Sequence, residues 1–255
     1  MKIIIMTEFV ISDFESTLSG IIHTICLIPV KLSTTVTRKQ GVLIIIKDVI
    51  GHSDMSESLK VDDYQCKKIG RTIIDASVNN LKIEHLNFYN AVTFMIGFIE
   101  SHGGGIMNHN LLEDLGFLVN TQNFVGGKRI IKNNLKEHPD MGVYDKRWEN
   151  FTKTCSMSLI NNRCLNFNKN YQTFCNKHGT PPTETNLYYP SKLETFAQFV
   201  KNDFWYKQSH SAVQDTIDLL NIVKSVVDYD GKNIFDGHSY LVPVKKHLLT
   251  SGYIH

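Results

Sequence analysis

The chain has 255 residues, which is enough for one or two domains with a buried core, and 42% of its residues are hydrophobic while 20% are charged. This composition excludes global disorder. A formal net charge of +2, with Lys and Arg scattered along the chain, gives little electrostatic support for nucleic-acid binding. The five cysteines stand at irregular positions and predict reduced thiols, because a disulfide framework needs a denser, paired set.

The amino-terminal region is apolar, so a signal peptide has to be considered. Glu8, Asp13 and Glu15 interrupt the apolar run early, and no stretch reaches the roughly 20 residues that a membrane span requires. We therefore predict a cytoplasmic protein that is not associated with a membrane. Residues 1–37 are interpreted as a short N-terminal extension.

Apolar runs and helical patterns alternate along the rest of the chain, which is typical of an α/β protein. The polar, Asn-rich segment 161–185 is interpreted as a linker, with a domain boundary near residue 180. The predicted elements, in chain order, are a strand within 38–50, a helix at 61–69 ending at Gly70, strands at 72–76 and 91–99, a helix at 110–115 ending at Gly116, a strand at 117–119, and an amphipathic helix at 215–227.

The strand predicted at 91–99 leads to His102, which three glycines follow. Such a strand would deliver a polar side chain to the carboxyl edge of an α/β sheet, where binding sites form. A histidine at a strand end is often only a hydrogen-bonded polar residue, so this pattern alone does not establish a catalyst. Cys155 lies further along the chain and is a candidate nucleophile.

Several segments, taken in order, resemble the caspase family, and most closely a catalytically impaired homologue of the nematode type. The resemblance covers about residues 38–255. The segment before His102 is similar to the family's strand that ends in Ser-His-Gly, and it is the most specific match. The other matching segments are 41–46, 69–81, 197–200, 203–208, 218–223 and 242–253.

The resemblance implies an α/β fold of the caspase type, a three-layer sandwich with a central, mostly parallel sheet flanked by helices. Residues 38–180 would form a large-subunit-like region and residues 181–255 a small-subunit-like region. His102 would be the base, Cys155 the nucleophile and Gly103 an oxyanion donor, without metal or cofactor. In a second register, residues 112–119 match the family's early Leu-Gly-Phe strand, and neither His102 nor Cys155 is then catalytic.

The chain departs from the family where aspartate specificity is built. Lys153 stands where the family has Gln, and the two arginines of the substrate pocket are absent. The resemblance therefore implies an apoptosis regulator without aspartate-specific protease activity. It would bind a caspase or caspase zymogen and restrain its activation, as a homo- or heterodimer through the small-subunit-like region. The alternative is an active cysteine endopeptidase of altered specificity with a His102/Cys155 dyad.

A zinc site is a further alternative, because three cysteines and a histidine lie within a short part of the chain. Their spacing fits no common zinc finger, and unrelated thiols are the simpler interpretation. The four residues are Cys155, Cys164, Cys175 and His178.

Overall fold

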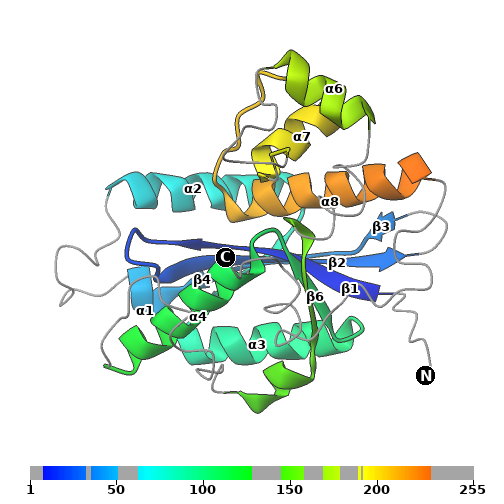
Figure 1. Cartoon of the computed structure of the whole chain (residues 1–255). Helices are drawn as coiled ribbons and strands as arrows, with labels where there is room; N and C mark the ends of the chain where they lie inside the picture. Colours follow the sequence, from blue (N-terminus) through cyan, green and yellow to red (C-terminus); the bar gives the residue numbers. More distant parts are fainter. Residues whose placement is uncertain are drawn as a thin grey trace, which may run out of the picture.

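The computed structural model describes residues 8–32, 36–50, 63–127, 145–157, 169–178, 189–190 and 192–230. Within these residues the chain is an α/β protein, with a mixed seven-stranded sheet flanked by seven α-helices (Figure 1). No helix in these ranges is long and apolar enough to cross a membrane.

The sheet has the strand order β5-β4-β2-β1-β6-β7, and β3 pairs with β2 off this path. β2 is antiparallel to β1, β3 and β4, whereas the pairs β1–β6, β4–β5 and β6–β7 are parallel. The sheet is thus mixed, where a mostly parallel one was expected. The strands are β1 (Glu8–Ser16), β2 (Ile22–Leu32), β3 (Val36–Arg38), β4 (Val42–Ile46), β5 (Lys82–Leu86), β6 (Gly105–Asn108) and β7 (Thr152–Cys155).

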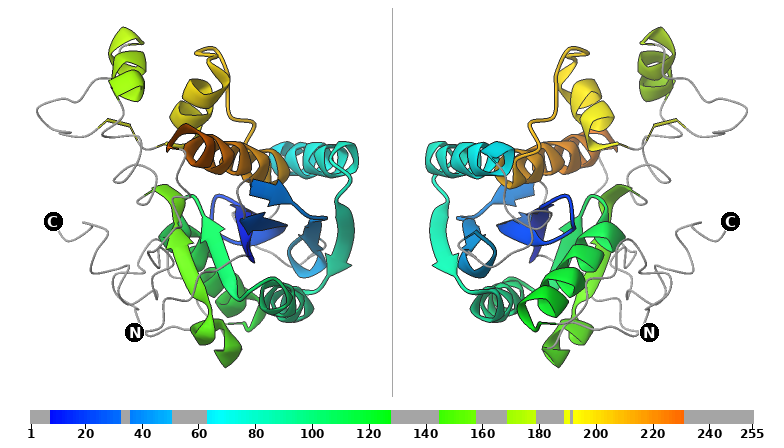
Figure 2. Two further views of the ribbon diagram at one scale, coloured as in Figure 1. Left: turned by 90° about the vertical axis from the view of Figure 1, so that its right-hand side faces the viewer. Right: turned by 90° about the vertical axis from the view of Figure 1, so that its left-hand side faces the viewer.

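Helices cover both faces of the sheet, and each face has its own buried core. α2 and α8 lie side by side over one face, with α6 and α7 beyond them, while α3 and α4 cover the other (Figures 1 and 2). The helices are α1 (Lys47–Ile50), α2 (Asp63–Val78), α3 (Phe88–Ser101), α4 (Leu111–Val125), α6 (Lys169–Lys177), α7 (Leu193–Lys201) and α8 (Ala212–Asp230), with a 3₁₀ turn η1 (Lys146–Asn150).

The segment expected to be a short extension supplies β1 and β2, the two central strands. Side chains alternate along β1, so that Phe9 and Ile11 pack under α8 while Val10 and Phe14 pack on the opposite face. Beyond residue 180, α8 packs against the same sheet and α7 packs on α8, so that Phe196 belongs to the same core as Phe9 and Ile11.

The strand predicted at 91–99 is wrong, because this segment lies within helix α3. Its buried residues recur at helical spacing, and the Asn87 side chain caps the helix by accepting a hydrogen bond from the Asn90 N–H (2.9 Å). A continuous apolar run does not distinguish a buried strand from a buried helix. The residues that pack inward are Phe88, Ala91, Val92, Met95, Ile96 and Ile99.

Two further strands were predicted where helices continue. α2 runs through Gly70 and includes 72–76, and α4 runs through Gly116 and includes 117–119. A glycine inside a helix costs only about 1 kcal/mol relative to alanine, and buried Leu115 and Leu118 on either side of Gly116 offset that cost. The predicted linker is also partly helical, since α6 lies within it and buries Tyr171 and Cys175.

Other predictions are confirmed. β4 occupies the β-branched run within 38–50, and the amphipathic segment 215–227 belongs to α8. The caspase-like segment 242–253 lies outside the described residues.

Candidate metal centre

The structure does not bring His102 and Cys155 together. His102 follows α3 and precedes β6, and its Nδ1 lies 2.7 Å from the carbonyl oxygen of Phe98. Cys155 ends β7, where it pairs in register with Asn108 at the carboxyl end of β6. The two residues are therefore at opposite ends of the β6–β7 pair.

The surroundings of Gly103 and Cys155 are those of structural residues. Gly103 has a φ of +92°, and a Cβ there would lie 2.2 Å from the backbone oxygen of Glu8. The buried Cys155 thiol donates a hydrogen bond to the carbonyl oxygen of His109 (3.1 Å). Close packing against β1 thus explains the glycine, and a core hydrogen bond explains the position of the thiol.

The proposed zinc ligands are also separated. Cys155 belongs to the core under α3 and α4, whereas Cys175 belongs to the core on the other face of the sheet. His178 stacks on the ring of Phe204, with ring centroids 4.0 Å apart. Cys164 lies outside the described residues.

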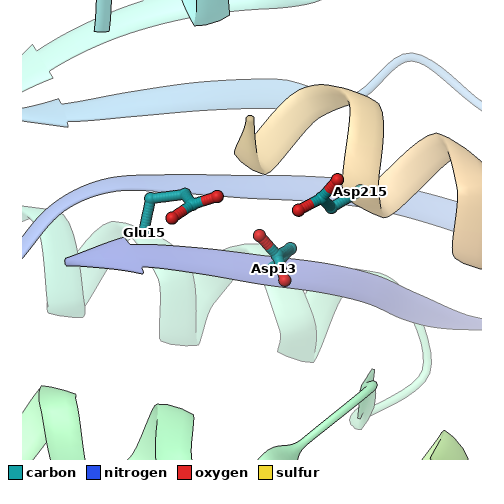
Figure 3. Close-up of side chains that lie close together, drawn as sticks. All are labelled: Asp13, Glu15 and Asp215. Atoms are coloured by element: carbon teal, nitrogen blue, oxygen red, sulfur yellow. The ribbon is translucent and has the colours of Figure 1, made fainter. Parts of the chain in front are cut away.

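Three acidic side chains do meet, on the face of the sheet that α8 covers. Asp13 and Glu15 come from β1 and Asp215 comes from the first turn of α8. One carboxylate oxygen from each lies within 4.8 Å of the others, and Figure 3 shows the three groups directed toward one another. Carboxylate oxygens at this separation are the ligands that Mg²⁺, Mn²⁺ and Ca²⁺ prefer.

Local structure explains why these carboxylates converge. Residues two apart on a strand share a face, so Asp13 and Glu15 both project toward α8. Gln208 fixes Asp215 by donating from its Nε2 to Oδ2 (2.7 Å). The other oxygen of Asp215, Oδ1, is buried and has no hydrogen-bond partner among the described residues. A buried, unpaired carboxylate oxygen needs a partner, and a cation is the partner that suits it.

A fourth carboxyl, Asp114, adjoins this group from α4. Asp114 is buried and accepts a hydrogen bond from Asn108 Nδ2 (2.8 Å), and Asn108 Oδ1 accepts one from Ser12 (2.7 Å). Those bonds tie α4 to β6 and β1. Asp114 is also close enough to Asp13 for its negative charge to raise the pKa of Asp13.

Burial raises the pKa of all four carboxyls, and neighbouring negative charges raise it further at Asp13, Asp114 and Asp215. Burial is the largest cause at each, and for Asp13 the charges of Asp215, Glu15 and Asp114 follow in that order. The pKa of Asp215 rises to about 8. Lys68 of α2 pairs with Glu15 (2.5 Å) and partly offsets the repulsion. One ammonium group against four carboxyls leaves an environment that favours further cations. We refer to Asp13, Glu15 and Asp215 as the carboxylate cluster, which Asp114 adjoins.

His210 lies five residues before Asp215 and has a positive φ, which is uncommon for residues other than glycine. Its φ of +52° is in the left-handed region, and its side chain is exposed just before α8 begins. Non-glycine residues in this region are strained and often belong to functional sites. Its position in the chain, just before the helix that carries Asp215, makes its imidazole a candidate proton acceptor.

In the sequence, Asp13 and Glu15 stand out as charges that interrupt an apolar run. The pattern held more information, because two acids separated by one residue within an apolar strand lie on the same face. No protein-family model matches the chain, and no curated protein matches it.

Proposed function

We propose that this protein is a divalent-metal-dependent nuclease that removes nucleotides from the 3′ ends of nucleic-acid strands. The observation that carries the proposal is the carboxylate cluster, in which Oδ1 of Asp215 has no hydrogen-bond donor within the described part of the chain. Clusters of carboxylates that hold two cations are a recurring device for phosphodiester hydrolysis, where the cations stabilise the attacking and the leaving oxygen.

The residues of the chain would divide the work as follows. The carboxylate cluster holds the cations, and Gln208 keeps Asp215 oriented. His210 accepts a proton from the attacking water as the water oxygen bonds to phosphorus. The bond from phosphorus to the 3′ oxygen breaks, and that oxygen takes up a proton from solvent. The product is a nucleoside 5′-monophosphate.

Access and charge favour action at a strand end. Asp114 and Asp215 are buried, while Asp13 and Glu15 keep part of their surface exposed, so a substrate would approach the cluster at Asp13 and Glu15. A flexible strand end reaches partly buried groups more easily than the middle of a duplex. A 3′ end brings a neutral hydroxyl, whereas a 5′ end commonly brings a terminal phosphate, which would occupy the cations without presenting a phosphodiester to them.

A net charge near zero does not oppose this proposal, although it led to the expectation that nucleic acid is not a partner. Bound cations attract the scissile phosphate locally, and this attraction does not require a basic surface. Salt dependence of binding should then be modest, because few Lys or Arg contacts to phosphates are released.

The caspase-like reading stays a prediction. It comprises a caspase-type three-layer sandwich, a cytoplasmic apoptosis regulator that binds a caspase zymogen, and the alternative cysteine endopeptidase. Its most specific residue match required a strand before His102, and that segment is helix α3. We therefore prefer the nuclease, which the arrangement of the carboxylate cluster supports.

The test uses purified protein and a single-stranded oligonucleotide labelled at its 5′ end. With Mg²⁺ or Mn²⁺ we expect a ladder of products shortened from the 3′ end, and no reaction in EDTA. Asp13→Asn and Asp215→Asn should abolish the ladder. The matched control is Asp218→Asn, a buried acid one turn further along α8 that pairs with Lys201 (2.9 Å).

Each remaining outcome decides between alternatives. An oligonucleotide with a blocked 3′ end should survive, and release of the 5′ label as a mononucleotide would reverse the proposed direction. Absence of metal-dependent hydrolysis of both DNA and RNA would reject the nuclease. Cleavage of Asp-containing peptides that Cys155→Ala abolishes would favour the endopeptidase instead.

A further inference from the structure

Trp205 is a large aromatic side chain that the protein leaves in solvent. It is 83% exposed and lies in the segment that joins α7 to α8. Its backbone N–H donates to Asp203 Oδ1 (3.0 Å), and the N–H of Tyr206 donates to the Asp203 carbonyl (3.2 Å). A hydrogen-bonded turn thus holds the backbone beneath the exposed indole.

Trp205 is the outermost ring of a packed aromatic series. Phe204 contacts it edge to face, with ring centroids 5.5 Å apart. On its other side Phe204 stacks on His178, and Phe174 of α6 contacts both. Because the rings behind the indole are packed, the indole is supported from within the protein and offers its remaining surface to a ligand.

The same segment continues into the carboxylate cluster. The Tyr206 hydroxyl is hydrogen-bonded to Asp218 of α8. The backbone N–H of Gln208 donates to Glu194 (2.9 Å), and its side chain holds Asp215. Three residues of fully extended chain span at most about 10 Å, so Trp205 lies within about that distance of the residue that orients the cluster.

We propose that Trp205 is a stacking platform for an unpaired nucleobase of the strand whose end lies at the carboxylate cluster. This inference rests on the proposed nuclease function and assigns it a single-stranded substrate. A single exposed indole can stack on a base only where that base has a free face, which a paired base inside a duplex lacks. Lys207, two residues further on, is exposed and lies 3.6 Å from Glu194, and its ammonium could exchange this partner for the backbone of the same strand.

The experiment uses the two tryptophans of the chain. Trp148 is buried, so Trp205 is the one that a ligand can reach. The full chain is titrated with an oligothymidylate of twelve nucleotides while tryptophan fluorescence is recorded. The buffer contains EDTA, so that the oligonucleotide is not hydrolysed. We expect quenching that Trp148→Phe retains and Trp205→Ala removes. A long duplex, whose bases have a free face only at its two ends, should quench far less at the same nucleotide concentration.

Affinity is measured separately by the anisotropy of a labelled oligonucleotide. Trp205→Ala should bind about five- to a hundredfold more weakly, and Trp205→Phe should lose less because its ring can still stack. Trp205→Ala affinity equal to that of the unmodified protein would overturn the platform. Quenching that depends on protein concentration without any oligonucleotide would overturn it too, because a second copy would then cover the indole.

The two proposals fail in different ways. Metal-dependent hydrolysis with no response of Trp205 rejects the platform and leaves the nuclease standing. Quenching of Trp205 by the oligonucleotide, with no hydrolysis in Mg²⁺ or Mn²⁺, rejects the nuclease and keeps the nucleobase site.

Discussion

Gln208 donates a hydrogen bond to Oδ2 of Asp215 and leaves Oδ1 of the same carboxylate buried without a partner among the described residues. The Gln208 amide fixes the orientation of the Asp215 carboxylate, so Oδ1 is also held in one position. A fixed, unpaired oxygen beside two other carboxylates costs free energy in the metal-free protein. Bound cations would remove this destabilisation, and the free energy gained would add to their affinity. Variants should therefore be compared first in the metal-free protein.

Asp215→Asn should separate metal binding from folding. Removing the charge relieves repulsion within the carboxylate cluster, so we expect the thermal stability of the metal-free protein to be unchanged or higher. The stabilisation by Mg²⁺ or Mn²⁺ should be lost, and at 100 times the dissociation constant that stabilisation amounts to about 2.7 kcal/mol. Thermal unfolding in EDTA and at increasing metal concentration measures both effects.

Asp218→Asn is the matched control, with the opposite pattern. Asp218 is buried and is paired with Lys201, Tyr206 and Gln214, so its loss should lower stability in EDTA by roughly 1–3 kcal/mol. Metal should still raise its melting temperature by the amount seen for the unmodified chain. Equal metal responses of Asp215→Asn and the unmodified chain would contradict a metal site at Asp215.

The metal-free protein should lose stability as pH rises from about 4 to about 8. The pKa of Asp215 is raised from 3.8 to about 8, mainly by burial. Below pH 4 the carboxyl is protonated in the folded and the unfolded chain alike. Between these values the carboxyl is ionised in the unfolded chain but protonated in the folded chain. The free energy of unfolding therefore falls by up to about 1.4 kcal/mol per pH unit because of this group.

Urea unfolding in EDTA at pH 5, 6, 7 and 8 measures this slope. Asp215→Asn should flatten it, because the titrating group is gone. Metal affinity should rise over the same range, since the ligand must lose its proton to bind. A metal-free protein that becomes more stable toward pH 8 would show that Asp215 ionises freely in the fold.

Lys68→Met should change stability and metal affinity in opposite directions. Lys68 pairs with Glu15, and both side chains are only 12% exposed. Without the ammonium the metal-free protein should lose roughly 1–3 kcal/mol, because Glu15 is left unpaired. Cations should bind about tenfold more tightly, since a positive charge no longer competes for the cluster. Calorimetry with Mn²⁺ measures the affinity, and the exposed Lys67→Met is the control that should change neither quantity.

The sequence was sufficient for the fold class and for elements whose pattern has one interpretation. The β-branched run of β4 suits a strand and little else, and the alternating stripe of α8 suits a helix. The run before His102 was different, because an apolar segment buried on most sides fits either element when it is read alone. The Asn87 cap and the spacing from Ala91 to Ile99 were the local signals that favoured a helix.

The carboxylate cluster could be predicted only in part. The two-residue spacing of Asp13 and Glu15 in an apolar strand predicts that both lie on the same face of the sheet. Asp114 and Asp215 join them from helices roughly 100 and 200 residues away along the chain, and only the sheet order, which places β6 beside β1 and α8 above it, brings them together. Sequence spacing carries no information on such a meeting.

Gly103 and Gly104 give a test of whether the turn after α3 is structural. Both have positive φ, so alanine at either position costs about 1–2 kcal/mol of backbone strain. At Gly104 a Cβ would meet nothing within 4 Å, whereas at Gly103 it would lie 2.2 Å from the Glu8 backbone oxygen and push β1 away from the turn. Gly103→Ala should therefore be less stable than Gly104→Ala by a further 1–3 kcal/mol or so.

Because Glu8 begins the strand that carries Asp13 and Glu15, Gly103→Ala should also weaken Mn²⁺ binding. Denaturant unfolding and calorimetry compare the two variants, and equal stabilities would refute close packing of Gly103 on β1.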